Sequence, residues 1–111
     1  MLANDVEALY AVFHSYNQWL DEDWGYNRDS RILTGPLMSL IDPVRAEAEL
    51  ELAISKGARF VTFRPAPVQA PDRFRSLADP MYDRFWNMAA DAGVAIAFHG
   101  ADSGYGIYLE R

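Results

Sequence analysis

The feature that most constrains the fold is the regular spacing of three short apolar runs, each preceded by a segment with a helical pattern. The runs are RILTGPL (31–37), ARFVTFRP (58–65) and VAIAF (94–98), centred near Ile32, Val61 and Ile96. Short runs of this composition, bounded by Gly or Pro, are typical of strands. Strands separated by helical crossovers are parallel, with right-handed connections. The sequence therefore predicts an α/β fold in the order α-β-α-β-α-β, with three parallel strands buried between helices.

The first 25 residues have the pattern of an amphipathic helix. Its apolar residues recur at spacings of three and four, as one helical face requires; they are Val6, Leu9, Tyr10, Phe13, Tyr16 and Leu20. Asn4 is expected to cap the helix, and Glu7, three residues later, completes a pattern similar to a capping box. Gly25 is expected to end the helix.

Two Asp-Pro pairs predict the starts of the other two helices, because an N-cap carboxylate followed by proline is a common way to begin one. Asp42-Pro43 precedes a segment rich in Ala, Leu and Glu that Gly57 closes. Asp79-Pro80 precedes a helical segment that ends at Gly93. The proline-rich stretch 65–78 between these units is expected to be a loop.

Length and charge limit the classes of function. The chain has 111 residues, enough for a single domain spanning 1–111, and half of them are apolar. Its net charge is −6 without any basic run, which argues against nucleic acid and against an anionic membrane surface as partners. The absence of cysteine excludes disulfides, zinc–thiolate sites and a cysteine nucleophile. With neither a signal-peptide pattern nor a membrane-spanning run, the chain is expected to be cytoplasmic.

The last predicted strand leads directly into a histidine. His99 and Gly100 follow VAIAF, and parallel α/β folds bind their ligands at the carboxyl ends of the strands. A neutral imidazole at such a position can ligate a metal, or act as an acid or base near neutral pH. The alternative is a purely structural histidine. His99 is therefore a candidate metal ligand.

Two further residues are candidates for substrate binding. Asp102, three residues after His99, can orient the imidazole or contribute to the site, but the Asp-Ser-Gly sequence is equally typical of a turn. Arg64 ends the second predicted strand. It can hold a substrate carboxylate with two parallel hydrogen bonds, or form a salt bridge to a neighbouring loop.

The remaining candidates point to structural roles. His14 lies at the edge of the apolar face of the first helix and is expected to be partly exposed. Because the chain has only two histidines and no H-x-H pair, it is not expected to build a closed two- or three-histidine site by itself. Tyr16, Trp19 and Trp24 are expected to pack the first helix against a neighbour, with an aromatic binding platform as the alternative.

Three phrases resemble the amidohydrolase-related (amidohydrolase 2) family. They are YNQWLDEDWGYNRDSRILTGPLMSL (16–40), GARFVTFRP (57–65) and AGVAIAFHGADSGYG (92–106). Members of this family are metal-dependent (β/α)8 barrels that act as hydrolases or non-oxidative decarboxylases. The resemblance covers about Tyr16 to Tyr105, less than half of a barrel that typically needs about 250 residues. It implies that the chain is an internal, partial segment of such a TIM-type barrel.

The resemblance also implies what the site would bind. His99 corresponds to the family's metal-ligating histidine at the end of a middle barrel strand. The implied cofactor is a divalent metal, expected to be zinc, although one histidine also fits manganese or iron. The implied parent activity is hydrolysis or decarboxylation of a small acid or cyclic compound. The family's other ligands have no counterpart in this sequence.

A second function class stays open beside the enzyme-derived one. Three parallel strands leave two open sheet edges, which favour self-association. The alternative to a truncated amidohydrolase is therefore a non-catalytic α/β scaffold or binding module that forms homo-oligomers.

Overall fold

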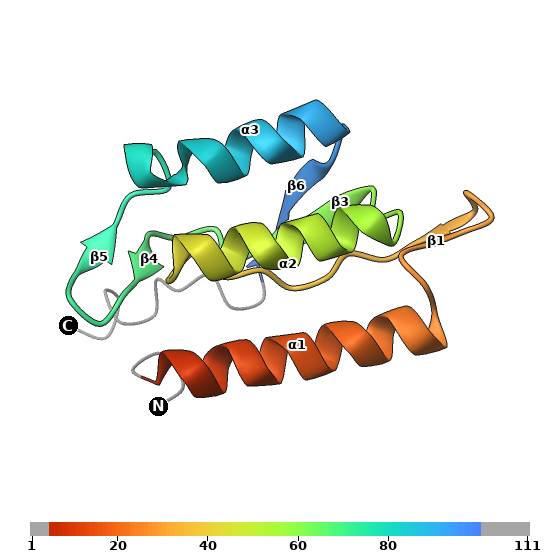
Figure 1. The fold of residues 1–111 in the computed structure, drawn as a ribbon, viewed down its shortest axis with the longest axis horizontal. Coiled ribbons are helices and arrows are strands. Elements are labelled where there is room, and N and C mark those ends of the chain that lie inside the picture. The colour runs from red at the N-terminus through yellow and green to blue at the C-terminus, as the bar shows by residue number, and fades with distance from the viewer. Residues whose placement is uncertain (1–4, 101–111) are drawn as a thin grey trace.

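The computed structural model describes residues 5–100, and in this part of the chain three α-helices run roughly parallel to one another (Figure 1). The elements are α1 (Val6–Asp23), β1 (Asn27–Arg28), β2 (Ile32–Leu33), α2 (Pro43–Ser55), β3 (Phe60–Phe63), β4 (Val68–Gln69), β5 (Phe74–Arg75), the 3-10 helix η2 (Pro80–Tyr82), α3 (Asp83–Ala92) and β6 (Ala95–Phe98). Within residues 5–100, no helix is both long and apolar enough to cross a membrane.

The helix boundaries follow the local capping signals. The carboxylate of Asp42 accepts hydrogen bonds from the backbone N–H groups of Val44 and Arg45, at 3.0 and 3.3 Å, so the first Asp-Pro pair starts α2 as predicted. Asp79 caps η2, which leads directly into α3. Gly93 ends α3 in the left-handed conformation, with φ of 70°.

The cap of α1 differs from the prediction by one position. The Asp5 carboxylate accepts from the N–H of Ala8 at 3.0 Å, so Asp5 is the N-cap. Asn4, the predicted cap, lies outside the described residues. At the other end, the left-handed Gly25 (φ 76°) follows the helix as predicted.

The central sheet contains one parallel pair, β3 and β6. Their register pairs Phe60 with Ala95 and Phe63 with Phe98. The two strands are joined through α3, so the prediction of parallel strands linked by a helical crossover is confirmed for this pair. The last three of the predicted elements, β3, α3 and β6, thus form a β-α-β unit.

The prediction of a third parallel strand at 31–37 is wrong for most of its length. Ile32–Leu33 forms a short hairpin with Asn27–Arg28, whose turn places Asp29 and Ser30 at positive φ. Only Leu37 joins the central sheet, through a single parallel bridge to Thr62. Pro36 has no N–H to donate, so the segment cannot build a longer ladder. The predicted loop 65–78 likewise contains an antiparallel pair, β4 and β5.

The side chain of Asn17 completes the hydrogen bonding of Leu37 on the edge away from β3. The bridge is made by Thr62 N–H to Pro36 O, at 2.9 Å, and Met38 N–H to Thr62 O, at 3.0 Å. The N–H and C=O of Leu37 therefore point away from β3. Both are bonded to the Asn17 amide, which donates to the carbonyl at 2.9 Å and accepts from the N–H at 2.8 Å. A helix side chain thus takes the place of a strand partner.

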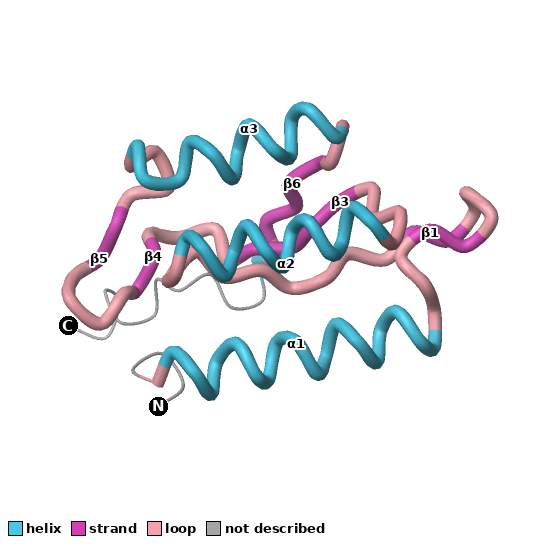
Figure 2. Tube along the Cα trace, in the orientation of Figure 1, coloured by secondary structure: helices cyan, strands magenta, loops and turns pink. Residues whose placement is uncertain are grey.

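Tyr10 fixes the same segment, which connects β2 to α2, at a point nearer to the start of α2. Its hydroxyl lies within hydrogen-bond distance of the Ser39 and Asp42 carbonyls, at 2.9 and 3.1 Å, and accepts from the N–H of Asp42 at 3.0 Å. Tyr10 and Asn17 are seven residues apart, which places them on one face of α1. Figure 2 shows this segment running as an extended loop alongside α2 before α2 begins.

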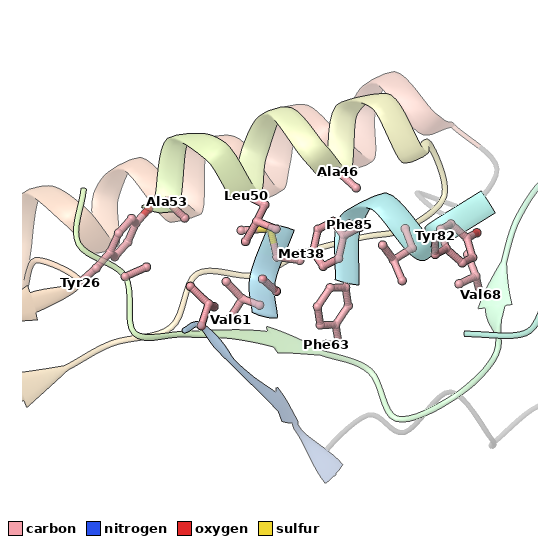
Figure 3. Close-up of a cluster of buried hydrophobic side chains, with 14 of the residues drawn as sticks. Tyr26, Met38, Ala46, Leu50, Ala53, Val61, Phe63, Val68, Tyr82 and Phe85 are labelled. Carbon is pink, nitrogen blue, oxygen red and sulfur yellow. The ribbon is translucent and has the colours of Figure 1, made fainter. Parts of the chain in front are cut away.

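The apolar core lies between the central sheet and helices α2 and α3 (Figure 3). Leu50, Val61, Tyr82 and Phe85 are fully buried. The rings of Phe63 and Phe85 pack edge to face, with centroids 5.6 Å apart. This core fixes the orientation of β3 and β6, and so fixes where their carboxyl ends lie.

The strand β6 is less buried than its apolar sequence predicts. Ala95 and Phe98 are exposed, and Phe98 has 49% of its surface accessible. No strand pairs with the outer edge of β6 within residues 5–100. The expected burial of every strand on both faces is therefore wrong for β6.

Candidate functional site

The carboxyl ends of β3 and β6 bring two of the predicted site residues into neighbouring positions. Because Phe63 pairs with Phe98, Arg64 and His99 are the first residues beyond two aligned strand ends. The N–H of His99 donates to the carbonyl of Phe63 at 2.9 Å, so the ladder continues to His99. Alternation along a pleated strand puts positions 64 and 99 on one side of the sheet. Both residues are exposed.

The described residues do not assemble a complete metal site. No group of three or more His, Asp or Glu side chains with metal-binding geometry occurs within residues 5–100. A protein metal site normally needs three or four ligands. His99 is thus a single potential ligand at the strand end. Asp102, a predicted substrate-binding residue, lies outside the described residues.

A cavity of about 470 Å³ lies beside the loop that follows β3. Its walls are Pro65–Pro67 and Phe74–Leu77, which are mostly apolar. Arg64 directly precedes this loop in the chain. Arg64 itself is not one of the wall residues, whereas Arg75 is.

Arg75 is a wall residue that the sequence analysis did not single out. Its guanidinium donates to the carbonyl of Ile41 at 2.8 Å and to the carboxylate of Asp72 at 2.9 Å. The pKa of Arg75 is raised, first because the Tyr82 hydroxyl interacts with it and then because Asp72 lies nearby. These contacts tie the loop to the segment before α2. The Asp-x-x-Arg spacing was the only signal in the sequence.

His14, the other histidine of the chain, takes part in contacts between helices and not in the site at the strand ends. Its Nδ1 atom lies 2.9 Å from the carboxylate of Glu49, which joins α1 to α2. Lys56 and Asp21 form a second ion pair between the same helices, also at 2.9 Å. The two pairs border a cavity of about 300 Å³ between α1 and α2. As predicted, His14 is partly exposed, with 52% of its side-chain surface accessible.

The aromatic residues of the first helix do not pack as predicted. Tyr16, Trp19 and Trp24 keep 41%, 48% and 47% of their surface exposed. Tyr16 and Trp19 contact each other, with ring centroids 5.8 Å apart. The prediction failed because the apolar arc of the helix is wider than the face that its neighbours cover.

Comparison with known proteins finds a solved structure whose fold is similar to that of this chain. No family model matches the chain, and no curated protein matches it. Among solved structures, it is similar to the crystal structure of amidohydrolase map2389c from Mycobacterium avium subsp. paratuberculosis, with a TM-score of 0.92 and 44% sequence identity over 98% of this chain. The chain spans 28% of the length of that protein. Its fold is therefore that of a part of an amidohydrolase.

Proposed function

We propose that the chain forms part of a metal-dependent (β/α)8 amidohydrolase barrel and that His99 supplies one ligand to its metal, expected to be zinc. The observation that carries this proposal is the position of His99, directly after β6 and in register with the end of β3. The similarity to an amidohydrolase over 98% of the chain supports it. The remaining ligands would come from polypeptide outside residues 5–100.

The parent reaction is hydrolysis or non-oxidative decarboxylation of a small acid or cyclic compound in the cytoplasm. A bound divalent metal would polarise a substrate group or lower the pKa of a bound water to about 7. Arg64 would hold the acidic group of the substrate, because guanidinium pairs with carboxylate through two parallel hydrogen bonds. Asp102, three residues after His99 in the sequence, would be a second substrate contact.

Zinc titration calorimetry tests the role of His99. We expect weak zinc binding by the wild-type chain and its loss in His99→Ala. His14→Ala is the matched control, since His14 is the other histidine and pairs with Glu49 between α1 and α2. Zinc binding that is lost in the control but kept in His99→Ala would contradict the proposal, as would a wild-type chain that binds no zinc.

A second candidate is a non-catalytic scaffold that self-associates, and the outer edge of β6 favours it. Ala95 and His99 donate their N–H groups toward β3, so those of Ile96 and Phe98 point away from β3. Sedimentation at increasing concentration tests this candidate. Phe98→Lys places a charge at the edge and is expected to shift dimers to monomers. A wild-type chain that stays monomeric at high concentration would exclude this candidate.

A further inference from the structure

Two side chains from distant parts of the chain bond opposite ends of one peptide group, the one between Ile41 and Asp42. The guanidinium of Arg75, in β5, donates to the carbonyl of Ile41 at 2.8 Å. The N–H of Asp42 donates to the hydroxyl of Tyr10, in α1, at 3.0 Å. The two contacts join residues 34 and 32 positions apart. This peptide group therefore links α1 to the loop that follows β3, residues 64–79.

The Ile41–Asp42 peptide group moves as one rigid unit. The bond is trans, so its C=O and N–H lie in one plane and point in opposite directions. A rotation of this plane that breaks the hydrogen bond to Tyr10 also turns the carbonyl away from Arg75. The geometry therefore favours keeping both hydrogen bonds or losing both.

The two hydrogen bonds also strengthen each other electronically. Arg75 is charged, and a charged donor on the carbonyl polarises the amide, which makes its N–H a better donor to Tyr10. Both side chains have little contact with water, since Tyr10 is 7% exposed and the side chain of Arg75 is 14% exposed. Losing either bond thus leaves a largely buried polar group without its partner.

Arg75 carries the link into the loop that follows β3. Its guanidinium also donates to the carboxylate of Asp72 at 2.9 Å, and its strand β5 pairs with β4. Arg75 is a wall residue of the cavity of about 470 Å³. A shift of Arg75 would therefore change both the order of the loop and the shape of this cavity.

We propose that the Ile41–Asp42 peptide group couples the position of α1 to the order of the loop that follows β3. With Tyr10 in place, the carbonyl faces Arg75 and the loop is fixed. When Tyr10 withdraws, the peptide group turns and the loop loosens. The coupling acts in both directions, because both side chains stabilise the same orientation of the peptide group. It uses neither His99 nor a metal, so it stands apart from the proposed function.

Amide hydrogen exchange of the whole chain, followed residue by residue by NMR, tests the coupling. Arg75→Met should speed exchange of the Asp42 N–H at least about threefold, although the hydroxyl of Tyr10 is still present. Tyr10→Phe should likewise speed exchange of the Ala70 N–H, which donates to the carbonyl of Arg73 within the loop. In the double variant, the acceleration at Ala70 should be smaller than the product of the two single accelerations.

Matched variants separate the coupling from a general loss of stability. Tyr26→Phe removes another hydroxyl that bonds a main-chain group of α1 and should leave the exchange of Ala70 unchanged. Arg73→Met removes an exposed cation of the same loop and should leave the exchange of Asp42 unchanged. Arg75→Lys keeps a cationic donor and should exchange at Asp42 at a rate closer to wild type than Arg75→Met does.

Three results would overturn the coupling. An unchanged Asp42 rate in Arg75→Met, or single accelerations that multiply at Ala70, would mean that the buried Leu40 and the cap of α2 hold the peptide group by themselves. Equal acceleration of the amides of α3 would mean that the variants only lower global stability. The single variants at Tyr10 and Arg75 each test the coupling alone, so one folded variant suffices.

Discussion

Helix α1 and the β3–α3–β6 unit are held in place by different forces. The unit is joined to α2 by apolar side chains from both helices and from β3, with Leu50, Val61 and Phe85 fully buried. From α1, only Leu20 enters this core. The helix is instead fixed by the Tyr10 hydroxyl and the Asn17 amide, both bonded to main-chain atoms of the segment before α2.

This difference shows that apolar burial stabilises one part of the molecule, whereas hydrogen bonds set the position of another. Apolar burial has no preferred direction, so it stabilises the unit without fixing a register. A hydrogen bond to a main-chain group fixes one residue against another, and its loss leaves a buried polar group without a partner. We therefore expect substitutions in the unit to lower global stability, and substitutions at the anchors to release α1 first.

The largest effect is expected from Phe85→Ala, which removes a fully buried ring that packs on Phe63. The free energy of unfolding should fall by about 3–5 kcal/mol, the usual cost of such a cavity. Urea denaturation followed by far-UV circular dichroism measures it. Leu52→Ala, in α2 and 40% exposed, is the control and should cost less than about 1 kcal/mol. Equal losses in both variants would remove the distinction between core and surface.

The next effect is expected from Asn17→Leu, which keeps the branched shape of the side chain but removes the amide. The N–H and C=O of Leu37 lose both partners, at a cost of about 2–3 kcal/mol. Hydrogen exchange should show faster opening in α1 than in α3. Gln18→Ala, a neighbouring exposed position, should leave exchange unchanged. Uniformly faster exchange in all three helices would mean that α1 is not a separate unit.

A smaller effect is expected from alkaline pH, through Tyr26. Its hydroxyl donates to the carbonyl of Asn17 at 3.0 Å. Burial, followed by the charges of Asp21 and Glu49, raises the pKa of Tyr26 to about 12. The unfolded chain has a tyrosine pKa of about 10. The folded state therefore holds this proton more tightly, and the stabilisation, present below pH 10, is lost as the pH rises toward 12.

Two pKa units at about 1.4 kcal/mol each set an upper bound of roughly 3 kcal/mol, and solvent screening of the hydroxyl should reduce the loss to about 2 kcal/mol or less. Denaturation at several alkaline pH values, compared with phenolate absorbance, measures it. Tyr26→Phe should lose some stability at neutral pH and show a shallower alkaline slope. An unchanged slope in Tyr26→Phe would assign the alkaline loss to other groups.

The sequence predicted those parts of the fold that depend on local signals. The Asp42-Pro43 helix start, the Gly93 helix end and strand β3 are recognisable from a few adjacent residues. The hairpin at 27–33 was missed because two apolar residues such as Ile32 and Leu33 are typical of parallel and of antiparallel strands. Only the strand that pairs with them decides between the two. The role of Asn17 depends on residue 37, twenty positions away, which no local pattern reveals.

The candidate site was predictable only in part. Because parallel strands align their carboxyl ends, the sequence placed Arg64 and His99 at one edge, and the register of β3 and β6 agrees. The metal-binding role of His99 stays a prediction. The exposure of Trp19 and the bonding of Arg75 depend on which neighbours cover each side of an element, so neither follows from composition.

The amide of Asn17 also closes one edge of the central sheet to strand pairing. With Leu37 already satisfied by Asn17, the central sheet offers only the β6 edge for pairing with another chain within residues 5–100. Two copies that pair through β6 use up both available edges, and the assembly closes as a two-fold dimer. A chain with two open edges would instead add copies without end. A single asparagine thus leaves the central sheet one edge for strand pairing where it would otherwise have two.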